Sequence, residues 1–352
     1  MLFLRPEDIR GLITLSEAIE AVELGFKEWA DNRELNQPRR RVHAPSGVRV
    51  SVHQGASPQS GLTGLVALGI RIRQTTETQK AERHAEPVYT LFDAESGDLS
   101  CVVVGDITPA ELPNYCVMAG VRTAAASAVG TSVLARPDAT TLGLIGGGKH
   151  ARYHVAAFAA IRKIKLIKMF QRDPVQRCAF AKEISELLKI EVQPVDTARQ
   201  AVEGVDIVLT ATNSSVPVFE GDWLQPGQHV TSIVGSNVAL LRSKQRTNKR
   251  REIDDRTIER MDVIAAASRD QAIEDQQGDL FDPIESGIIG LDDVKDIGDI
   301  LTGRVPGRVS ADQLTLFKNN AGQGICDVAL IAKVVARARE RKLGLEMPFS
   351  GR

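Results

Sequence analysis

The chain has 352 residues, and its 44 lysines and arginines against 45 aspartates and glutamates give a formal net charge of −1, which argues against a nucleic-acid-binding or acidic-membrane-binding protein. A hydrophobic fraction of 43% and a charged fraction of 25% are typical of a globular protein, and at ~150 residues per domain the length suggests about two domains. The four cysteines lie far apart without metal-ligand spacing, so we expect no disulfide framework and no metal site, as in a reducing cytoplasm.

The N-terminal part of the chain predicts one helix and a mostly antiparallel sheet. Residues 1–4 are apolar, a run too short for a signal peptide or a membrane span, so we expect no membrane association. From Ser16 onward, apolar side chains recur at helical spacing. Between residues 40 and 101, apolar runs separated by Gly, Ser and Pro predict strands.

The rest of the chain predicts an α/β domain. A helix of small residues is expected over 118–134, and from Thr141 onward strands alternate with helices, as in a doubly wound, Rossmann-type parallel sheet. After about residue 303 the chain turns polar and then forms a helix with an apolar stripe and a basic end, which we expect to dock on the first domain. We therefore predict a substrate-binding and dimerisation domain at 1–138, rejoined by 309–352, and a nucleotide-binding domain at 139–308.

A glycine cluster between a predicted strand and helix carries the first chemical signal. Gly146, Gly148 and Ala151 form a GxGxxA pattern, in which the first glycine permits a tight turn, the second lets the backbone approach a pyrophosphate, and the third small residue lets helix and strand touch. Phosphate oxygens meet the positive end of such a helix, so Lys149 and His150 are expected near the cofactor. A glycine-rich turn without a ligand is the alternative.

The next strand, expected over 165–170, indicates which dinucleotide is bound. Many NAD enzymes place Asp or Glu after this strand to bind the adenine ribose, whereas this chain has Gln171 and Arg172. Gln171 does not repel a 2′-phosphate and Arg172 can pair with one, which favours NADP over NAD. The alternative is that Arg172 is a solvated loop residue and that Asp173 caps the helix begun by Pro174.

Taken together and in order, several motifs resemble the ornithine cyclodeaminase and mu-crystallin family over nearly the full chain. The matching stretches are Gly120–Ser127, GLIGGGKHA at 143–151, Asp206–Thr212, Ile233–Asn237, Arg251–Asp254 and Leu316–Asn320. The resemblance implies a homodimer whose N-terminal sheets meet, a middle Rossmann domain, a substrate cleft between the domains, and NAD or NADP chemistry on the carbon–nitrogen bond of amino or imino acids. It also implies cofactor contacts at Thr210, Ala211, Thr212, Gly235 and Ser236.

The same resemblance implies a clamp for an α-carboxylate. Arginine suits this role because its planar fork makes two parallel bonds to a carboxylate. Arg122 matches the arginine of the family's RTAA motif, Arg39 or Arg41 matches an upstream one, and Thr123 is expected to contact cofactor or substrate. A salt bridge on a helix surface is the alternative for Arg122. For Asp327, a helix cap or a dimer contact is as plausible as a role in the site.

Two departures from the family pattern limit what can be carried over. Where cyclodeaminases have a lysine and an aspartate, this chain has Arg71 and Asn237. Arginine, with a pKa above ~12, does not readily exchange a proton and an amide is not a base, so both residues are expected to line the reaction centre and orient a substrate. Lys80 and His84, in a predicted loop, are further proton-donor candidates, although a solvated loop also explains them.

The leading hypothesis is a cytoplasmic NAD(P)-dependent oxidoreductase that acts on a small amino or imino acid, as an imine reductase or amino-acid dehydrogenase. Hydride attack on a protonated imine needs mainly orientation and a carboxylate clamp. The first alternative is an ammonia lyase of the ornithine cyclodeaminase type with recycled NAD, which requires general acid–base help worth ~10²- to 10⁴-fold. The second alternative is a catalytically silent NADP-bound sensing protein.

Overall fold

The structure is a computed structural model that divides the chain into two compact units. Unit 1 comprises Met1–Ala125, Ala239–Thr247 and Gly322–Arg352, and unit 2 comprises Ala126–Val238 and Asn248–Ala321. The boundary therefore falls after Ala125, inside a helix, rather than at the expected position 138, and residues 309–321 belong to unit 2 rather than to the first domain. The residues described are 1–74, 79–84, 86–117, 119–235, 238, 241, 247–320 and 322–348, of which 71–74 and 79–84 are described by their backbone alone.

Unit 1 is built on a mostly antiparallel sheet. Its strand order is β16-β1-β7-β6-β4-β3-β2, with β5 paired to β4, and β1 runs parallel to β7. The expected strands between residues 40 and 101 are thus confirmed, but residues 79–84 form β5 rather than a loop. The bounds are β1 Leu2–Leu4, β2 Asn36–His43, β3 Val48–Ser57, β4 Leu62–Gln74, β5 Gln79–His84, β6 Val88–Asp93, β7 Leu99–Val104 and β16 Leu345–Glu346.

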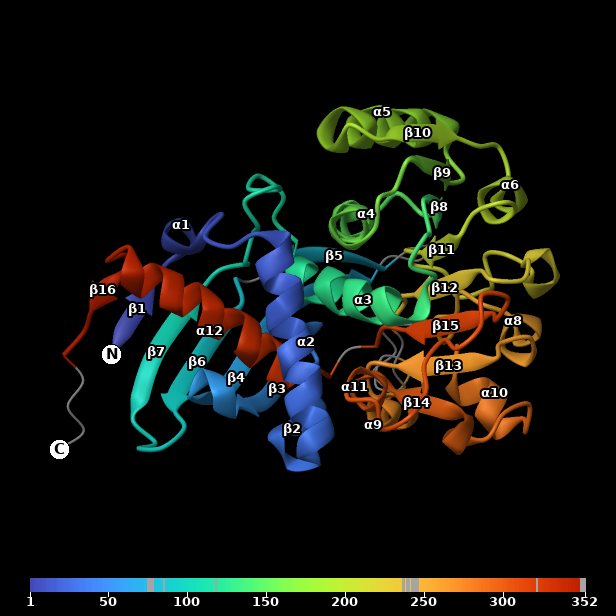
Figure 1. The fold of residues 1–352 in the computed structure, drawn as a ribbon. Coiled ribbons are helices and arrows are strands. Elements are labelled where there is room, and N and C mark those ends of the chain that lie inside the picture. The colour runs from blue at the N-terminus through green and yellow to red at the C-terminus, as the bar shows by residue number, and fades with distance from the viewer. Residues whose placement is uncertain are drawn as a thin grey trace. The chain divides into compact units, whose positions relative to one another are not determined.

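One long helix packs on a face of this sheet, and a second long helix packs on the first. The short helix α1 spans Pro6–Ile9, and α2 spans Leu15–Asp31, beginning one residue earlier than expected because Thr14 and Glu17 cap it reciprocally. The C-terminal helix α12, Gly324–Glu340, crosses α2 and lies against β3 (Figure 1), as predicted. This contact is backbone to backbone, since a Cβ on Gly55 of β3 would lie 2.2 Å from the amide nitrogen of Ile325.

Unit 2 contains a sheet in which every strand pair is parallel. Its order is β10-β9-β8-β11-β12-β15-β13-β14, so the chain runs outward from β8 in one direction and then from β11 in the other. This doubly wound order confirms the predicted Rossmann-type fold and places a topological switch point between β8 and β11. The bounds are β8 Thr141–Ile145, β9 Leu166–Phe170, β10 Glu191–Pro194, β11 Ile207–Thr210, β12 His229–Ser232, β13 Val263–Ala266, β14 Val294–Asp296 and β15 Thr315–Lys318.

Strand β15 explains why residues 309–321 belong to unit 2. It pairs with β12 on one side and β13 on the other, and all four of its side chains are buried. So short a strand carries no periodic pattern, which is why the sequence did not predict it. The further α-helices are α3 Gly120–Leu134, α4 Lys149–Ile161, α5 Pro174–Leu188, α6 Ala198–Val202, α8 Asp255–Glu259, α9 Arg269–Glu274, α10 Phe281–Glu285 and α11 Ile297–Leu301. Short 3-10 helices are η1 Arg33–Leu35, η2 Pro58–Ser60, η3 Gly221–Trp223 and η4 Leu291–Asp293.

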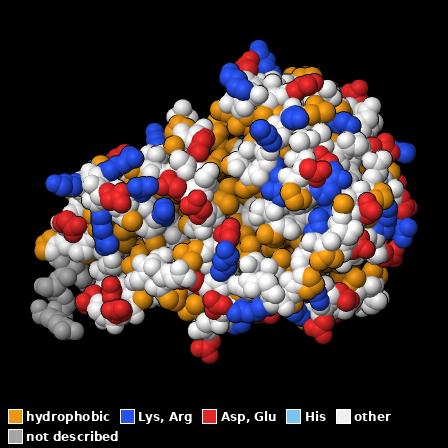
Figure 2. All heavy atoms as spheres, in the orientation of Figure 1, with side chains coloured by type: hydrophobic (Ala, Val, Ile, Leu, Met, Phe, Trp, Pro, Cys, Tyr) orange, Lys and Arg blue, Asp and Glu red, His pale blue; other side chains and the backbone are white. Residues whose placement is uncertain are grey.

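The surface carries both signs of charge. On the face drawn in Figure 2, basic and acidic side chains are interspersed. Within the described part of the chain, no helix has the length and apolar character needed to cross a membrane.

Candidate functional site

The glycine turn lies at the switch point of unit 2. Gly146 follows β8 with a φ of +107°, and a Cβ there would lie 2.5 Å from the carbonyl oxygen of Ala211 at the end of β11. Gly148 is exposed, and a Cβ built on it would meet no atom within 4 Å. Ala151 is fully buried in the first turn of α4. Each of the three residues thus meets the geometric requirement for which its type was singled out.

The residues present fit a dinucleotide pyrophosphate. No side chain caps α4 at Gly148, whereas Asp173 caps α5 and Thr197 caps α6. An uncapped helix start with open space in front of its exposed glycine is suited to phosphate oxygens. Lys149 is exposed and His150 partly exposed in the same turn.

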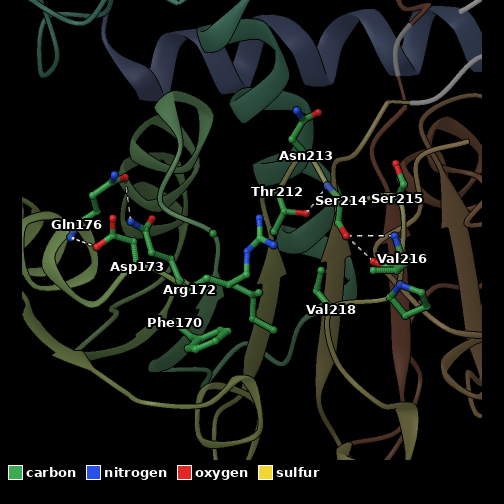
Figure 3. A pocket seen from close by; sticks show the side chains of 14 residues that line it. Phe170, Arg172, Asp173, Gln176, Thr212, Asn213, Ser214, Ser215, Val216 and Val218 are labelled. Atoms are coloured by element: carbon green, nitrogen blue, oxygen red, sulfur yellow. Dashed lines mark hydrogen bonds between the residues drawn. The ribbon is translucent and has the colours of Figure 1, made fainter. Parts of the chain in front are cut away.

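A cavity of about 740 Å³ adjoins this turn. It is lined by Ile145 and Gly146, by residues 170–173 and 176 around the end of β9, and by residues 212–218 after β11. Figure 3 shows the side chain of Arg172 directed into this cavity, and Arg172 makes no ion pair or hydrogen bond among the described residues. The cavity therefore offers one exposed cation where the adenosine end of a dinucleotide lies in such folds.

Asp173, the acidic residue beside Arg172, forms hydrogen bonds at the start of α5. An Asp173 carboxylate oxygen accepts hydrogen bonds from the backbone nitrogens of Val175 at 2.9 Å and Gln176 at 3.2 Å, so it caps α5, as the alternative interpretation held. Gln171 lies against the glycine turn, since its Oε1 would be 2.1 Å from a Cβ on Gly147. Asp173 also lines the cavity, with one of its carboxylate oxygens engaged in the cap of α5.

Residues at and after the end of β11, which were expected to contact the cofactor, are hydrogen-bonded to a buried glutamate. Glu252 accepts hydrogen bonds from the hydroxyls of Thr210 at 3.0 Å and Thr212 at 2.7 Å, and from the backbone nitrogen of Val234 at 2.9 Å. The Thr210 and Thr212 hydroxyls thus donate to Glu252 of the protein itself. The carbonyl oxygen of Ala211 lies against Gly146. Glu252 fixes the segments that follow β11 and β12, both at the carboxyl edge of the sheet where ligands bind.

A buried ion pair supports the same edge. Lys318, at the end of β15, lies 2.6 Å from Asp279, and the two side chains are 1% and 0% exposed. The lysine also donates to Ser232 Oγ and the Val234 carbonyl oxygen, each at 2.9 Å. Asp279 in turn accepts from the backbone nitrogen of Glu252 at 2.8 Å, so the pair and the glutamate form one network.

In unit 1, Arg122 belongs to a buried polar cluster. It lies in the first turn of α3 and is 4% exposed. Its Nε donates to Asp327 at 2.9 Å and one Nη1 hydrogen goes to Gln323 at 3.2 Å, both on or next to α12. Asp327 also binds His53 of β3, whose Nδ1 lies 2.8 Å away. The surface salt bridge considered for Arg122 is wrong, because its partner is buried.

The electrostatics of this cluster favour a fixed carboxylate. Burial opposes ionisation of Asp327, but Arg122 and the hydrogen bond from His53 hold its pKa below the usual range. Burial lowers the pKa of His53, despite Asp327, so the imidazole is held in its neutral form. Within the described part of the chain, no partner binds the Nη2 group or the second Nη1 hydrogen of Arg122.

The other predicted arginines are arranged on β2. Arg39 is near enough for its charge to lower the pKa of His53, and Arg41 pairs across the strands with Ser51, two residues from His53 on β3. Arg39, Arg122 and His53 thus come together, although their strands and helix are distant in sequence. Thr123 donates its hydroxyl hydrogen to the Ala119 carbonyl oxygen at 2.7 Å.

Most side chains predicted to line the reaction centre are not among those that the structure describes. Arg71 pairs with Val48 through its backbone, but its side chain is among those not described, as are the side chains of Lys80 and His84. Ser236 and Asn237 lie outside the described residues, while Gly235 has open space around a would-be Cβ. Among the described residues, no group of three His, Cys, Asp or Glu side chains could hold a metal ion.

Sequence reasoning missed His53 and Asp279 and gave no role to Glu252 or Lys318. A signal existed for Lys318, because a lysine inside an apolar segment needs a buried partner. No comparable signal marked Asp279 or His53, since their partners lie far along the chain.

Together, the fold and these sites define a two-unit α/β protein of the dinucleotide-binding type. The sequence model of the ornithine cyclodeaminase/mu-crystallin family matches residues 1–342, and the chain belongs to this family, as its motifs indicated. It is 27% identical over 352 residues to a Bacillus cereus Delta(1)-pyrroline-2-carboxylate reductase, which covers 99% of this chain and 100% of the relative. It is 26% identical over 345 residues to ketimine reductase mu-crystallin of Macropus fuliginosus, covering 95% of this chain and 96% of that protein. The structure of Thermococcus litoralis Delta(1)-pyrroline-2-carboxylate reductase in complex with NADH and L-proline is similar, with a TM-score of 0.81, 25% identity, and coverage of 99% of this chain and 100% of that one.

Proposed function

We propose that the protein is an NAD(P)-dependent imine reductase whose substrate is a small imine bearing an α-carboxylate. The observation that carries the proposal is the presence, in one chain, of a glycine turn suited to a pyrophosphate and of a buried arginine, Arg122, whose Nη2 group has no partner among the residues described. Full-length relatives named for the reduction of cyclic imino acids and ketimines support the reaction class. The dinucleotide, when bound, supplies or accepts the hydride.

The chain's own residues bind and orient the substrate in this proposal. Asp327 and Gln323 fix two donors of Arg122, so the guanidinium plane is set before a ligand arrives. The remaining N–H donors of Arg122 bind the substrate carboxylate, and Arg39 and Arg41 add positive charge from β2. Such a fixed clamp places the α-carbon without loss of side-chain entropy on binding.

The test is consumption of NADPH or NADH with preformed cyclic imines and with mixtures of α-keto acids and amines. We expect turnover of an α-carboxylated imine and none of its methyl ester, because the ester lacks the charge that Arg122 binds. Arg122→Lys keeps the charge but loses the fork, so KM is expected to rise ~10- to 100-fold. Tight NADPH binding with no turnover across the panel supports the sensing alternative instead, and ammonia release from ornithine with NAD supports the lyase.

Within this proposal, NADP is the preferred coenzyme. Arg172 is exposed, directed into the cavity and unpaired among the described residues, and Asp173 is committed to the cap of α5. A 2′-phosphate therefore meets a cation beside a carboxylate that already accepts two backbone hydrogen bonds.

Titration with 2′,5′-ADP and 5′-AMP tests the coenzyme preference apart from turnover. We expect 2′,5′-ADP to bind more tightly, and Arg172→Ala to weaken it ~10- to 100-fold while leaving 5′-AMP unchanged. Arg199→Ala, which removes an exposed arginine paired with Glu203, is the control. Equal binding of the two nucleotides contradicts the preference.

Two further proposals concern assembly and location. Val42, Val48 and Val50 are exposed on the face of β2 and β3 opposite α12, which supports a homodimer formed through the unit 1 sheet. A cytoplasmic location is supported by the four cysteines, which are all free.

A further inference from the structure

The imidazole of His53 has one nitrogen with a partner and one without. Nδ1 lies 2.8 Å from Asp327, and because a carboxylate accepts hydrogen bonds, Nδ1 carries the hydrogen. Nε2 is buried and has no hydrogen-bond partner among the described residues, in a side chain that is 2% exposed. A buried ring nitrogen that carries no hydrogen and has no protein donor is available to accept a hydrogen bond from a ligand.

The position of His53 is tightly built. Asn36 of β2 donates to the Gly322 carbonyl oxygen at 2.8 Å and accepts from the Ile325 nitrogen at 3.0 Å. A Cβ on Gly324 would lie 2.1 Å from the carbonyl oxygen of Gln54, the residue after His53. These contacts hold the start of α12, and with it Asp327, directly on β3. The direction of the imidazole is therefore fixed by the fold.

Arg122 shares Asp327 with His53, which places the two side chains around one carboxylate. In an α-imino or α-amino acid, the nitrogen is attached to the carbon that carries the carboxylate. A carboxylate on the free donors of Arg122 therefore brings that nitrogen into the neighbourhood of the cluster. This step rests on the proposed function.

We propose that His53 is a catalytic residue whose Nε2 accepts the N–H of the substrate and transfers the proton at its nitrogen. In the direction of amine oxidation, Nε2 takes a proton from the ammonium group and becomes N–H. The hydrogen on Nδ1 remains there and stays hydrogen-bonded to Asp327. The C–H bond electrons leave as hydride to the oxidised dinucleotide, and the nitrogen lone pair forms the C=N bond. In reduction, the Nε2 proton returns to nitrogen as hydride adds to carbon, so atoms and charge balance.

The charges around His53 agree with a neutral acceptor. Asp327 of α12 favours the protonated form, whereas burial, Arg122 of α3 and Arg39 of β2 disfavour it, and the net effect is a pKa below the ordinary 6.5. Tyr89 of β6 lies close enough to feel Asp327, but burial and that carboxylate raise its pKa well above the usual value, so it stays neutral. His53 thus accepts a proton at neutral pH, and Asp327 stabilises the imidazolium when it forms.

The experiment compares two flat ligands that differ at one atom. Pyrrole-2-carboxylate offers a ring N–H next to its carboxylate, and furan-2-carboxylate offers an oxygen in the same place. By calorimetry at pH 8, we expect the pyrrole to bind about tenfold more tightly. The preference is expected to disappear in His53→Leu at pH 8, with furan affinity unchanged. His53→Gln, whose amide oxygen accepts a hydrogen bond, is expected to keep part of the preference.

Turnover gives a second readout. With the amino acid as substrate, His53→Gln is expected to lower kcat ~10²- to 10⁴-fold and to remove the acidic limb of its pH profile, with KM little changed. His154→Gln is the control, because His154 is equally buried and its Nε2 also lacks a partner, yet it lies on α4. Equal affinity of the two ligands, or a preference that survives in His53→Leu, overturns the inference alone. Failure of both ligands to bind overturns the carboxylate clamp, and this inference with it.

Discussion

Asp106 shows how one carboxyl group can set the position of Arg122. Its Oδ1 accepts a hydrogen bond from the Ala119 nitrogen at 3.2 Å, immediately before α3, and Ala119 has the unusual φ of +54°. Burial, with a contribution from Glu86, raises the pKa of Asp106 to about 6. The start of α3, and therefore the arginine in its first turn, depends on a group that titrates near neutrality.

The sign of the pH dependence follows from that pKa. A carboxyl group with a folded-state pKa raised from 3.8 to about 6 stabilises the fold fully at low pH and loses that contribution as pH rises through 6. Asp106→Asn cannot ionise, so we expect the stability of the variant relative to wild type to rise by up to ~3 kcal/mol between pH 4 and pH 7.5. Urea unfolding at both pH values measures this, with exposed Asp98→Asn as control. Parallel profiles for wild type and Asp106→Asn would contradict the expectation.

At the scale of elements, the sequence predicted what is local and missed what is distant. The glycine turn, the cap of α5 by Asp173 and the docking of α12 each depend on neighbouring residues or on a helical period, and all three are present. His53 and Asp327 are 274 positions apart, so no local pattern could join them. β15 was missed for a similar reason, since a four-residue buried strand owes its structure to β12 and β13.

The end of β15 yields a prediction at this scale. Removing one partner of a buried ion pair leaves an uncompensated charge, so Lys318→Met is expected to lower the free energy of unfolding by ~3–5 kcal/mol. Lys249→Met is the matched control, because Lys249 pairs with Asp282 at 2.7 Å in the same unit but with both side chains partly exposed, and its loss should cost under ~1 kcal/mol. Denaturant unfolding measures both, and equal losses would show that the Asp279 network does not hold the sheet edge.

At the scale of the whole molecule, the two faces of β3 differ in what covers them. Ser51 and His53 point to the side of α12 and are buried, whereas the alternate residues Val48 and Val50 are 37% and 39% exposed. Val42 of β2 pairs across the strands with Val50 and is 74% exposed. An apolar cross-strand cluster on an uncovered sheet face is suited to a second copy of the same surface, as a two-fold symmetric dimer requires.

The double variant Val42→Asp with Val50→Asp tests this assembly. In a symmetric interface each subunit would bury two unpaired carboxylates, and the desolvation of these charges opposes association. We therefore expect the wild type to sediment as a dimer and the double variant as a monomer. Val175→Asp is the control, since Val175 on α5 of unit 2 is 76% exposed and outside this face. Because the substitutions lie on the face opposite His53, the monomer is expected to retain the preference for pyrrole-2-carboxylate. A double variant that remains dimeric would place the interface elsewhere, and a monomer that loses the preference would mean that the partner subunit helps to order the clamp.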